Sequence, residues 1–172
     1  EEQKALALTP PAEGGPIGNR PLTIKYVIDN IKEKAASILD FGAGKFAKGT
    51  KLLDGPEGAG FTNVTAYELP TNQVEGVHDP DAISGWKYDI VVASNVVNVQ
   101  MTPEVLDKTL RQIAGSTKIE DGVAYINYPE GPRKMVPEAL SAAAMKGELL
   151  KHFSFVKQVG KNPRAPIWEA RF

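Results

Sequence analysis

Residues 37–44 read Ser-Ile-Leu-Asp-Phe-Gly-Ala-Gly, a short apolar run that stops at two glycines. An apolar run of this length is typical of a strand buried on both faces, and the glycines predict a tight turn directly behind it. Residues 45–53 then have the length and composition of a short helix. This stretch therefore predicts a strand, a turn and a helix in succession.

The same alternation of strands and helices continues on both sides of this unit. The predicted helices cover residues 22–35, a segment that begins at Thr102, and residues 137–150 with Ala143 and Ala144 facing inwards. The predicted strands are 64–69, 88–93, 122–128, 153–159 and 167–172, with a weak additional one at 74–77. This order predicts an α/β fold: a Rossmann-like, doubly wound, mainly parallel sheet with one antiparallel strand near the C-terminus.

The chain has 172 residues, which is the size of one ordinary domain. Residues 1–21 contain four of the 13 prolines and three of the 16 glycines, so they predict an extended N-terminal arm. Residues 22–172 are expected to form the single folded domain.

Composition excludes several kinds of chemistry. The chain has no cysteine and two histidines, so we expect no thiolate, iron–sulfur or histidine-based metal site. No apolar run of 18 residues and no signal pattern is visible, so we expect a cytoplasmic protein without a membrane partner. The net charge of −1 gives no attraction of the whole molecule to nucleic acid, and any such argument must be local.

The glycine turn is compatible with three kinds of ligand. A P-loop is rejected because Gly49 is followed by Thr50 without the required lysine. Gly42, Gly44 and Ala47 match a relaxed dinucleotide pattern, but a carboxylate at Asp40 would repel a pyrophosphate. That carboxylate would instead attract a cationic ligand. A turn without any ligand also remains open.

An acidic residue at the end of the next strand strengthens the case for a nucleoside ligand. Glu68 follows Gly44 by 24 residues, and a carboxylate there can accept both hydroxyls of a ribose. Asp40-Phe41-Gly42-Ala43-Gly44 resembles the first motif of class I S-adenosylmethionine-dependent methyltransferases, and Glu68 resembles their acidic second motif. Asp81-Ala82 is similar to the loop that contacts the cofactor adenine.

The resemblance covers roughly residues 22–172 and implies S-adenosylmethionine as the cofactor. The residues it implies for cofactor binding are Asp40, Gly42, Gly44, Glu68, Leu69, Asp81, Ala82, Ser94 and, from the arm, Arg20. The segments ILDFGAG and YDIVVASNVVNV also resemble a narrower group, the methyltransferases associated with DNA phosphorothioation and their phage relatives.

Two strand ends carry the candidate acceptor site. Amino-directed DNA methyltransferases have a polar residue, two prolines and an aromatic residue after the fourth strand. Here the sequence is Ser94-Asn95-Val96-Val97, which lacks the prolines and the aromatic residue. Asn95 can accept a hydrogen bond from an amino group and Tyr128 can supply a stacking ring, although strand capping and loop packing explain both residues equally well. Methylation at cytosine C5 is excluded because it requires a cysteine nucleophile.

Positive charge is concentrated late in the chain. Residues 1–128 contain 12 Lys and Arg against 17 Asp and Glu, whereas residues 129–172 contain eight against four. A basic rim of this kind is typical of a phosphate-bearing substrate, although isolated lysines are also common on any solvated surface. The predicted nucleic-acid contacts are Lys45, Arg133, Lys134, Lys161 and Arg164.

Together these features predict an enzyme, an S-adenosylmethionine-dependent methyltransferase that modifies a base amino group of nucleic acid, with DNA favoured. A chain of 172 residues has little room for target recognition, so we expect low sequence specificity, help from a partner subunit, or a single-stranded target. Two alternatives stay open: a methyltransferase-like binding module without catalysis, and a nicotinamide-binding domain.

Overall fold

Six strands form one sheet in the computed structural model, which describes residues 21–94, 96, 102–128, 141–160 and 166–172. The strands are β1 (Ser37–Phe41), β2 (Asn63–Tyr67), β3 (Ile90–Ala93), β4 (Val123–Asn127), β5 (Phe155–Val159) and β6 (Ile167–Arg171). Their order across the sheet is β2-β1-β3-β4-β6-β5. The first four are parallel, and β6 is antiparallel to both of its neighbours, which confirms the predicted fold class. The predicted arm, apart from its last residue, lies outside the described residues.

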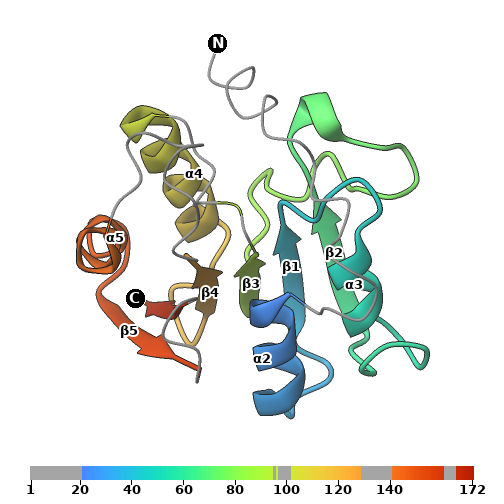
Figure 1. Ribbon diagram of the computed structural model, residues 1–172. Helices are drawn as coiled ribbons and strands as arrows, with labels where there is room; N and C mark the ends of the chain where they lie inside the picture. The colour runs from blue at the N-terminus through green and yellow to red at the C-terminus, as the bar shows by residue number, and fades with distance from the viewer. Residues whose placement is uncertain (1–20, 95, 97–101, 129–140, 161–165) are drawn as a thin grey trace.

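Helices cover both faces of this sheet (Figure 1). They are α2 (Leu22–Asn30), α3 (Lys48–Leu53), α4 (Pro103–Gly115) and α5 (Ala142–Leu149), with a short 3-10 turn, η1 (Pro70–Asn72). One apolar cluster contains Ile24 and Leu53 of α2 and α3, and the other contains Leu110 and Met145 of α4 and α5. Because side chains alternate along a strand, each strand contributes residues to both clusters. None of the described helices has the length and apolarity needed to cross a membrane.

Local chemistry explains where two of the helices begin. Thr102 accepts a hydrogen bond from the Val105 amide at 3.2 Å, so α4 starts at the predicted cap. The predicted start of α3 at Lys45 is too early: the helix begins at Lys48, because Ala47 before it has a φ of 46° in the left-handed region.

The weak strand predicted at residues 74–77 does not form. The segment is a turn instead, in which the amides of Val77 and His78 both donate to the Val74 carbonyl. Gly76 has a φ of 79°, which an extended strand does not tolerate. Within the described part of the chain, β2 is therefore an edge strand, and residues 70–89 run as a loop from its end to β3.

The predicted inner face of the last helix is also wrong. Ala143 and Ala144 are exposed, whereas Met145 and Leu149 are fully buried. Alanine does not distinguish a buried face from an exposed one, so the larger side chains decide which face of α5 packs against the sheet.

Candidate cofactor and acceptor site

The turn after β1 is held by three hydrogen bonds from consecutive amides. The N–H groups of Gly42 and Ala43 both donate to the Tyr67 carbonyl, at 2.9 Å and 3.0 Å. The next N–H, that of Gly44, donates to Glu68 Oε2 at 3.0 Å. The amides that a phosphate-binding turn would offer to its ligand are therefore already used inside the protein.

Glycine is required at the first position of this turn. Gly42 has a φ of 71°, and a Cβ added there would lie 2.5 Å from Val96 Cγ2. Gly44, with a φ of 81°, also occupies the left-handed region that favours glycine. Both glycines thus have a backbone reason to be where the sequence predicted a ligand-binding turn.

Glu68 connects this turn to the end of β2. Its carboxylate accepts from the Gly44 amide through Oε2 and from the Leu69 amide through Oε1, the latter at 2.9 Å. The side chain is buried. A carboxylate has about four lone-pair positions, so two remain for further donors. Glu68 therefore lies against the glycine turn, and Leu69 contacts the same carboxylate through its amide.

His78 also holds the turn, a role that the sequence did not reveal. Its Nδ1 accepts from the Val74 amide at 2.9 Å, which leaves the proton on Nε2. Nε2 then donates to the Gly44 carbonyl at 2.7 Å. The imidazole is buried and 34 positions away from Gly44 in sequence, so only the path of the loop after β2 brings the two together.

Asp40 lies below the turn and faces α3. Its Oδ2 accepts from the Thr50 hydroxyl at 2.8 Å, and the residue is 3% exposed. Burial, with a smaller contribution from the nearby Glu68 carboxylate, raises the pKa of Asp40 to about 7. Two carboxyl groups thus flank one turn, and a bound cation would favour the charged form of Asp40.

The predicted adenine loop is fixed at both ends. The Asp79 amide donates to the Ala66 carbonyl, and the Tyr88 hydroxyl donates to the Ala82 carbonyl at 2.8 Å. Asp81 is exposed, whereas Ala82 is fully buried. Asp81 can therefore offer its side chain to a ligand, while Ala82 serves to hold the loop.

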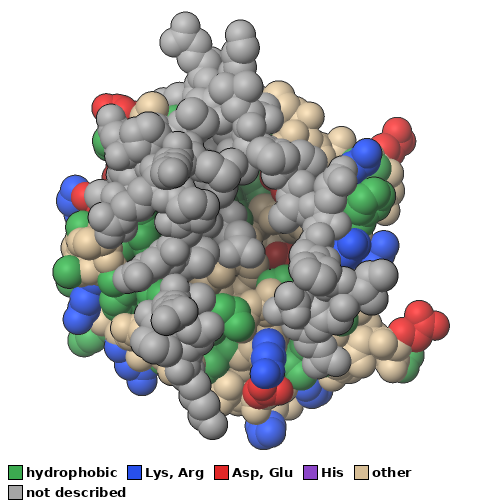
Figure 2. Space-filling model, in the orientation of Figure 1, with side chains coloured by type: hydrophobic (Ala, Val, Ile, Leu, Met, Phe, Trp, Pro, Cys, Tyr) green, Lys and Arg blue, Asp and Glu red, His purple; other side chains and the backbone are tan. Residues whose placement is uncertain are grey.

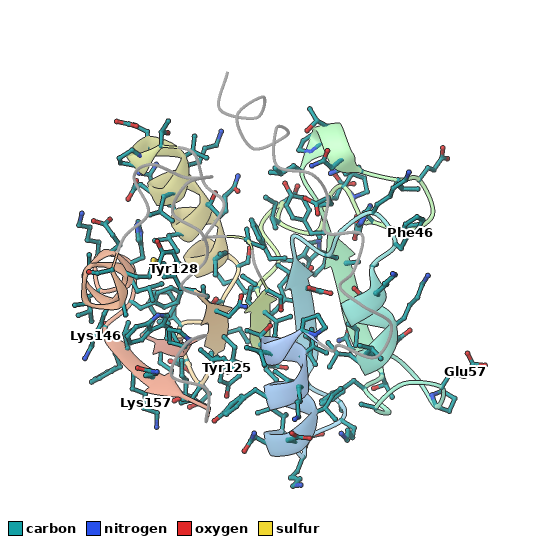
Figure 3. All side chains as sticks on the ribbon, in the orientation of Figure 1. Phe46, Glu57, Tyr125, Tyr128, Lys146 and Lys157 are labelled. Atoms are coloured by element: carbon teal, nitrogen blue, oxygen red, sulfur yellow. The ribbon has the colours of Figure 1, made fainter. Side chains whose placement is uncertain are left out.

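Two predicted site residues, Ser94 for the cofactor and Tyr128 for the acceptor, are tied to neighbouring packing. The Ser94 hydroxyl, directly after β3, hydrogen-bonds to the hydroxyl of Thr23 in α2. Tyr128, directly after β4, is 5% exposed and belongs to the apolar cluster under α4 and α5 (Figure 3). Its amide donates to the Pro166 carbonyl at 3.0 Å.

Some predicted site residues lie outside the described residues: Arg20, Asn95, Arg133, Lys134, Lys161 and Arg164. The remaining predicted nucleic-acid contact, Lys45, is exposed in the glycine turn. Within the described ranges, no group of three or more histidine, aspartate or glutamate side chains is arranged to hold a metal ion.

The site residues fit a nucleoside with a cationic group better than a diphosphate. The turn presents carboxylates at Asp40 and Glu68, and its own amides from Gly42 to Gly44 are occupied. Carboxylates accept from ribose hydroxyls and attract an ammonium group, but they repel phosphates.

Comparisons with known proteins give the same fold. Neither a protein-family model nor a curated protein matches the chain. A TehB-like SAM-dependent methyltransferase from Corynebacterium glutamicum superposes with a TM-score of 0.63 at 16% identity, over 90% of this chain and 89% of that chain. A SAM-dependent methyltransferase from Bacteroides fragilis, in complex with S-adenosyl-L-homocysteine, gives 0.62 at 11% identity, over 90% and 79%.

A nucleic-acid enzyme is also among the structural neighbours. A 16S rRNA methyltransferase from T. thermophilus, in complex with AdoMet and guanosine, superposes with a TM-score of 0.56 at 14% identity. It matches 92% of this chain, which spans 44% of that longer protein. The strand order, the closing antiparallel strand and these neighbours show that the chain has the Rossmann-like fold of class I S-adenosylmethionine-dependent methyltransferases.

Proposed function

We propose that this chain is an S-adenosylmethionine-dependent methyltransferase that acts on nucleic acid, with DNA as the favoured substrate and a base amino group as the acceptor. The observation that carries the cofactor assignment is the contact between Glu68 Oε2 and the Gly44 amide. Because the Gly44 amide already donates to this carboxylate, it is not available to bind a pyrophosphate. The nicotinamide alternative is disfavoured for the same reason.

Each predicted cofactor residue then has a role that follows from its position. The free lone pairs of Glu68 accept from the ribose hydroxyls, and Asp40 supplies negative charge near the amino group. Asp81 and the loop held by Ala82 border the adenine. Leu69, Gly42 and Gly44 form the backbone wall. From outside the described residues, Arg20 is assigned to the cofactor carboxylate.

S-adenosylmethionine, when bound, supplies a sulfonium methyl group for an in-line displacement. The protein's task is mainly to hold the acceptor in line, which can contribute roughly 7–11 kcal/mol. We assign this task to Asn95 and Tyr128, at the ends of the two central strands. A duplex base would have to be flipped out to reach them.

The choice of nucleic acid rests on charge. Lys45 is exposed in the turn, and the basic residues Arg133, Lys134, Lys161 and Arg164 follow β4 and β5 in sequence. We propose that they form a phosphate-binding rim, and that a partner subunit contributes to target recognition. A closer relationship to the phosphorothioation-associated methyltransferases stays a prediction from sequence.

A second candidate is a module that binds the cofactor without transferring its methyl group. The buried ring of Tyr128 and the occupied hydroxyl of Ser94 favour it, because neither group is free to meet a substrate as the chain is folded here. In this case the site would report cofactor levels to a partner protein.

Calorimetry with S-adenosylmethionine, followed by transfer of a tritiated methyl group, separates these functions. We expect cofactor binding, no binding of NADH, and label on DNA in preference to RNA or protein. Replacing Arg133 and Lys134 by glutamate should weaken DNA binding and flatten its salt dependence. Cofactor binding without transfer to any acceptor would favour the module, and absence of cofactor binding would overturn both candidates.

A further inference from the structure

An exposed aromatic ring lies in the glycine turn between two lysines. Phe46 is 45% exposed, and the Nζ atoms of Lys45 and Lys48 lie 5.5 Å and 6.0 Å from its ring centroid. Figure 3 shows Phe46 pointing outwards beside α3. We call these three residues the Phe46 platform.

The position of this ring separates it from the other exposed apolar side chains. The large exposed hydrophobic residues in the described part of the chain are Phe46, Trp86, Ile119, Leu150 and Phe155. Trp86, Ile119 and Leu150 come before β3, β4 and β5, and Phe155 is the first residue of β5. These four residues therefore belong to the amino end of the sheet. Phe46 follows β1 and lies at the carboxyl end, beside the proposed cofactor site.

The backbone under the ring is held in place. The Ala47 amide donates to the Gly44 carbonyl at 3.2 Å, and the same carbonyl accepts from His78 Nε2. Ala47 then caps α3 in the left-handed conformation. A ring presented from a fixed backbone loses little conformational freedom on binding, which favours a recognition role.

Positive charge is concentrated in the segment that carries the ring. Residues 41–53 contain Lys45, Lys48 and Lys51 and no acidic residue, although the whole chain has a net charge of −1. All three lysines are exposed. Figure 2 shows Lys and Arg side chains next to exposed hydrophobic ones on the right-hand edge of this face, over the α3 side. An anionic partner with flat apolar groups complements this surface.

We propose that the Phe46 platform binds single-stranded nucleic acid by stacking one base on Phe46 while Lys45 and Lys48 contact the adjacent phosphates. This arrangement tolerates any sequence, because every base has a stacking face. The inference rests on the proposed function in that it names the form of the substrate. Phe46 and Tyr128 lie on opposite sides of the central strands in Figure 3, so the base stacked on Phe46 is a different nucleotide from the acceptor.

The test measures the fluorescence anisotropy of a labelled 20-nucleotide thymidine oligonucleotide with the full chain. Phe46→Ala should weaken binding between about fivefold and about 150-fold, the range for loss of one base stack. Phe46→Trp should retain the affinity. Phe155→Ala is the matched control, because it removes an exposed phenylalanine from the start of β5 and should change nothing.

The lysines are tested through salt. Replacing Lys45 and Lys48 by glutamine should reduce the slope of log affinity against log salt by about 1.4, since each single-strand phosphate contact contributes about 0.7. Lys32→Gln, at the opposite end of the sheet, should leave the slope unchanged. Thermal unfolding and calorimetry with S-adenosylmethionine confirm that each variant is folded.

Two outcomes would overturn the proposal directly: the wild type does not bind the oligonucleotide, or Phe46→Ala binds it with the same affinity as the wild type. A third concerns polyglutamate, which has negative charge but no bases. If Phe46→Ala weakens the binding of polyglutamate as much as that of the oligonucleotide, base stacking is not the cause and the proposal fails. Duplex DNA of the same sequence should bind more weakly, and uridine oligonucleotides distinguish RNA from DNA as the source. Methyl transfer that survives while Phe46→Ala binds normally would refute this inference and leave the proposed function intact. Binding that depends on Phe46, without methyl transfer to any acceptor, would support this inference and refute the proposed methyltransferase function.

Discussion

The two halves of the sheet's carboxyl end satisfy their polar groups in different ways. At the ends of β1 and β2, the side chains of Glu68 and His78 bond to the backbone of the glycine turn. At the end of β3, the Ser94 hydroxyl bonds to another side chain, Thr23 of α2. Side chains that hold a backbone define the shape of a binding surface, whereas a pair of hydroxyls holds two elements together. The backbone of the first half is therefore held in place by the protein's own side chains.

The largest test of this difference is Glu68→Ala. The variant leaves the buried Gly44 amide and the partly buried Leu69 amide without an acceptor, which costs up to about 1–3 kcal/mol for each, and removes the proposed ribose contact. We expect the affinity for S-adenosylmethionine to fall by about 100-fold or more, measured by calorimetry. Glu57→Ala, which alters an exposed glutamate far from the turn, is the control (Figure 3). Unchanged affinity in Glu68→Ala would remove this residue from the site.

The next effect concerns the charge on Asp40 and depends on pH. The pKa of Asp40 is raised to about 7 in the folded protein, so the folded state holds a proton that the unfolded state has released above about pH 4. The contribution of this proton to the free energy of unfolding is complete at low pH and is lost as the pH rises towards 7. Asp40→Asn, which keeps an acceptor for the Thr50 hydroxyl, should remove this loss.

The measurement is urea unfolding of both proteins between pH 4 and pH 8. The stability of Asp40→Asn relative to the wild type should increase by a few kcal/mol across this range, because a shift of one unit corresponds to about 1.4 kcal/mol. The same substitution should weaken cofactor binding at pH 8, where the wild-type carboxylate is charged. A difference in stability that does not vary with pH would show that Asp40 ionises normally.

The smallest effect is expected in the other half, at Ser94. Ser94→Ala leaves the fully buried Thr23 hydroxyl without its partner and should lower the free energy of unfolding by about 1 kcal/mol. The double variant with Thr23→Val should recover part of this loss, since no polar group remains unpaired. Calorimetry should show little change in cofactor affinity for either. A large loss of affinity would instead support the sequence prediction that Ser94 contributes to cofactor binding.

Sequence patterns predicted those parts of the fold that depend on neighbouring residues. The run from Ser37 to Phe41 became β1, and the Thr102 cap started α4 where expected. The two closing strands, predicted at 153–159 and 167–172, lie at Phe155–Val159 and Ile167–Arg171. Each of these features needs only local periodicity or a cap, which a short window of sequence contains.

The failures depend on contacts between distant residues. Val74 and Val77 have the apolar character of a strand. The His78 imidazole, however, accepts a hydrogen bond from the Val74 amide and closes the segment into a turn. The role of His78 was not predicted, because the residues next to it in sequence do not indicate a contact with Gly44, 34 positions away. In the same way, Glu68 was predicted from its spacing, but its two amide contacts required the folded loop.

The place of β6 between β4 and β5 has a consequence for how the chain is made. Ile167–Arg171 is the last strand in sequence, yet it pairs on both sides and lies inside the sheet. During synthesis, β4 and β5 emerge from the ribosome without the strand that joins them, and β5 has no partner until residues 167–171 follow. The glycine turn and β1 to β3 can assemble earlier, so a nascent chain would complete the half with the glycine turn first and the half that β6 closes last.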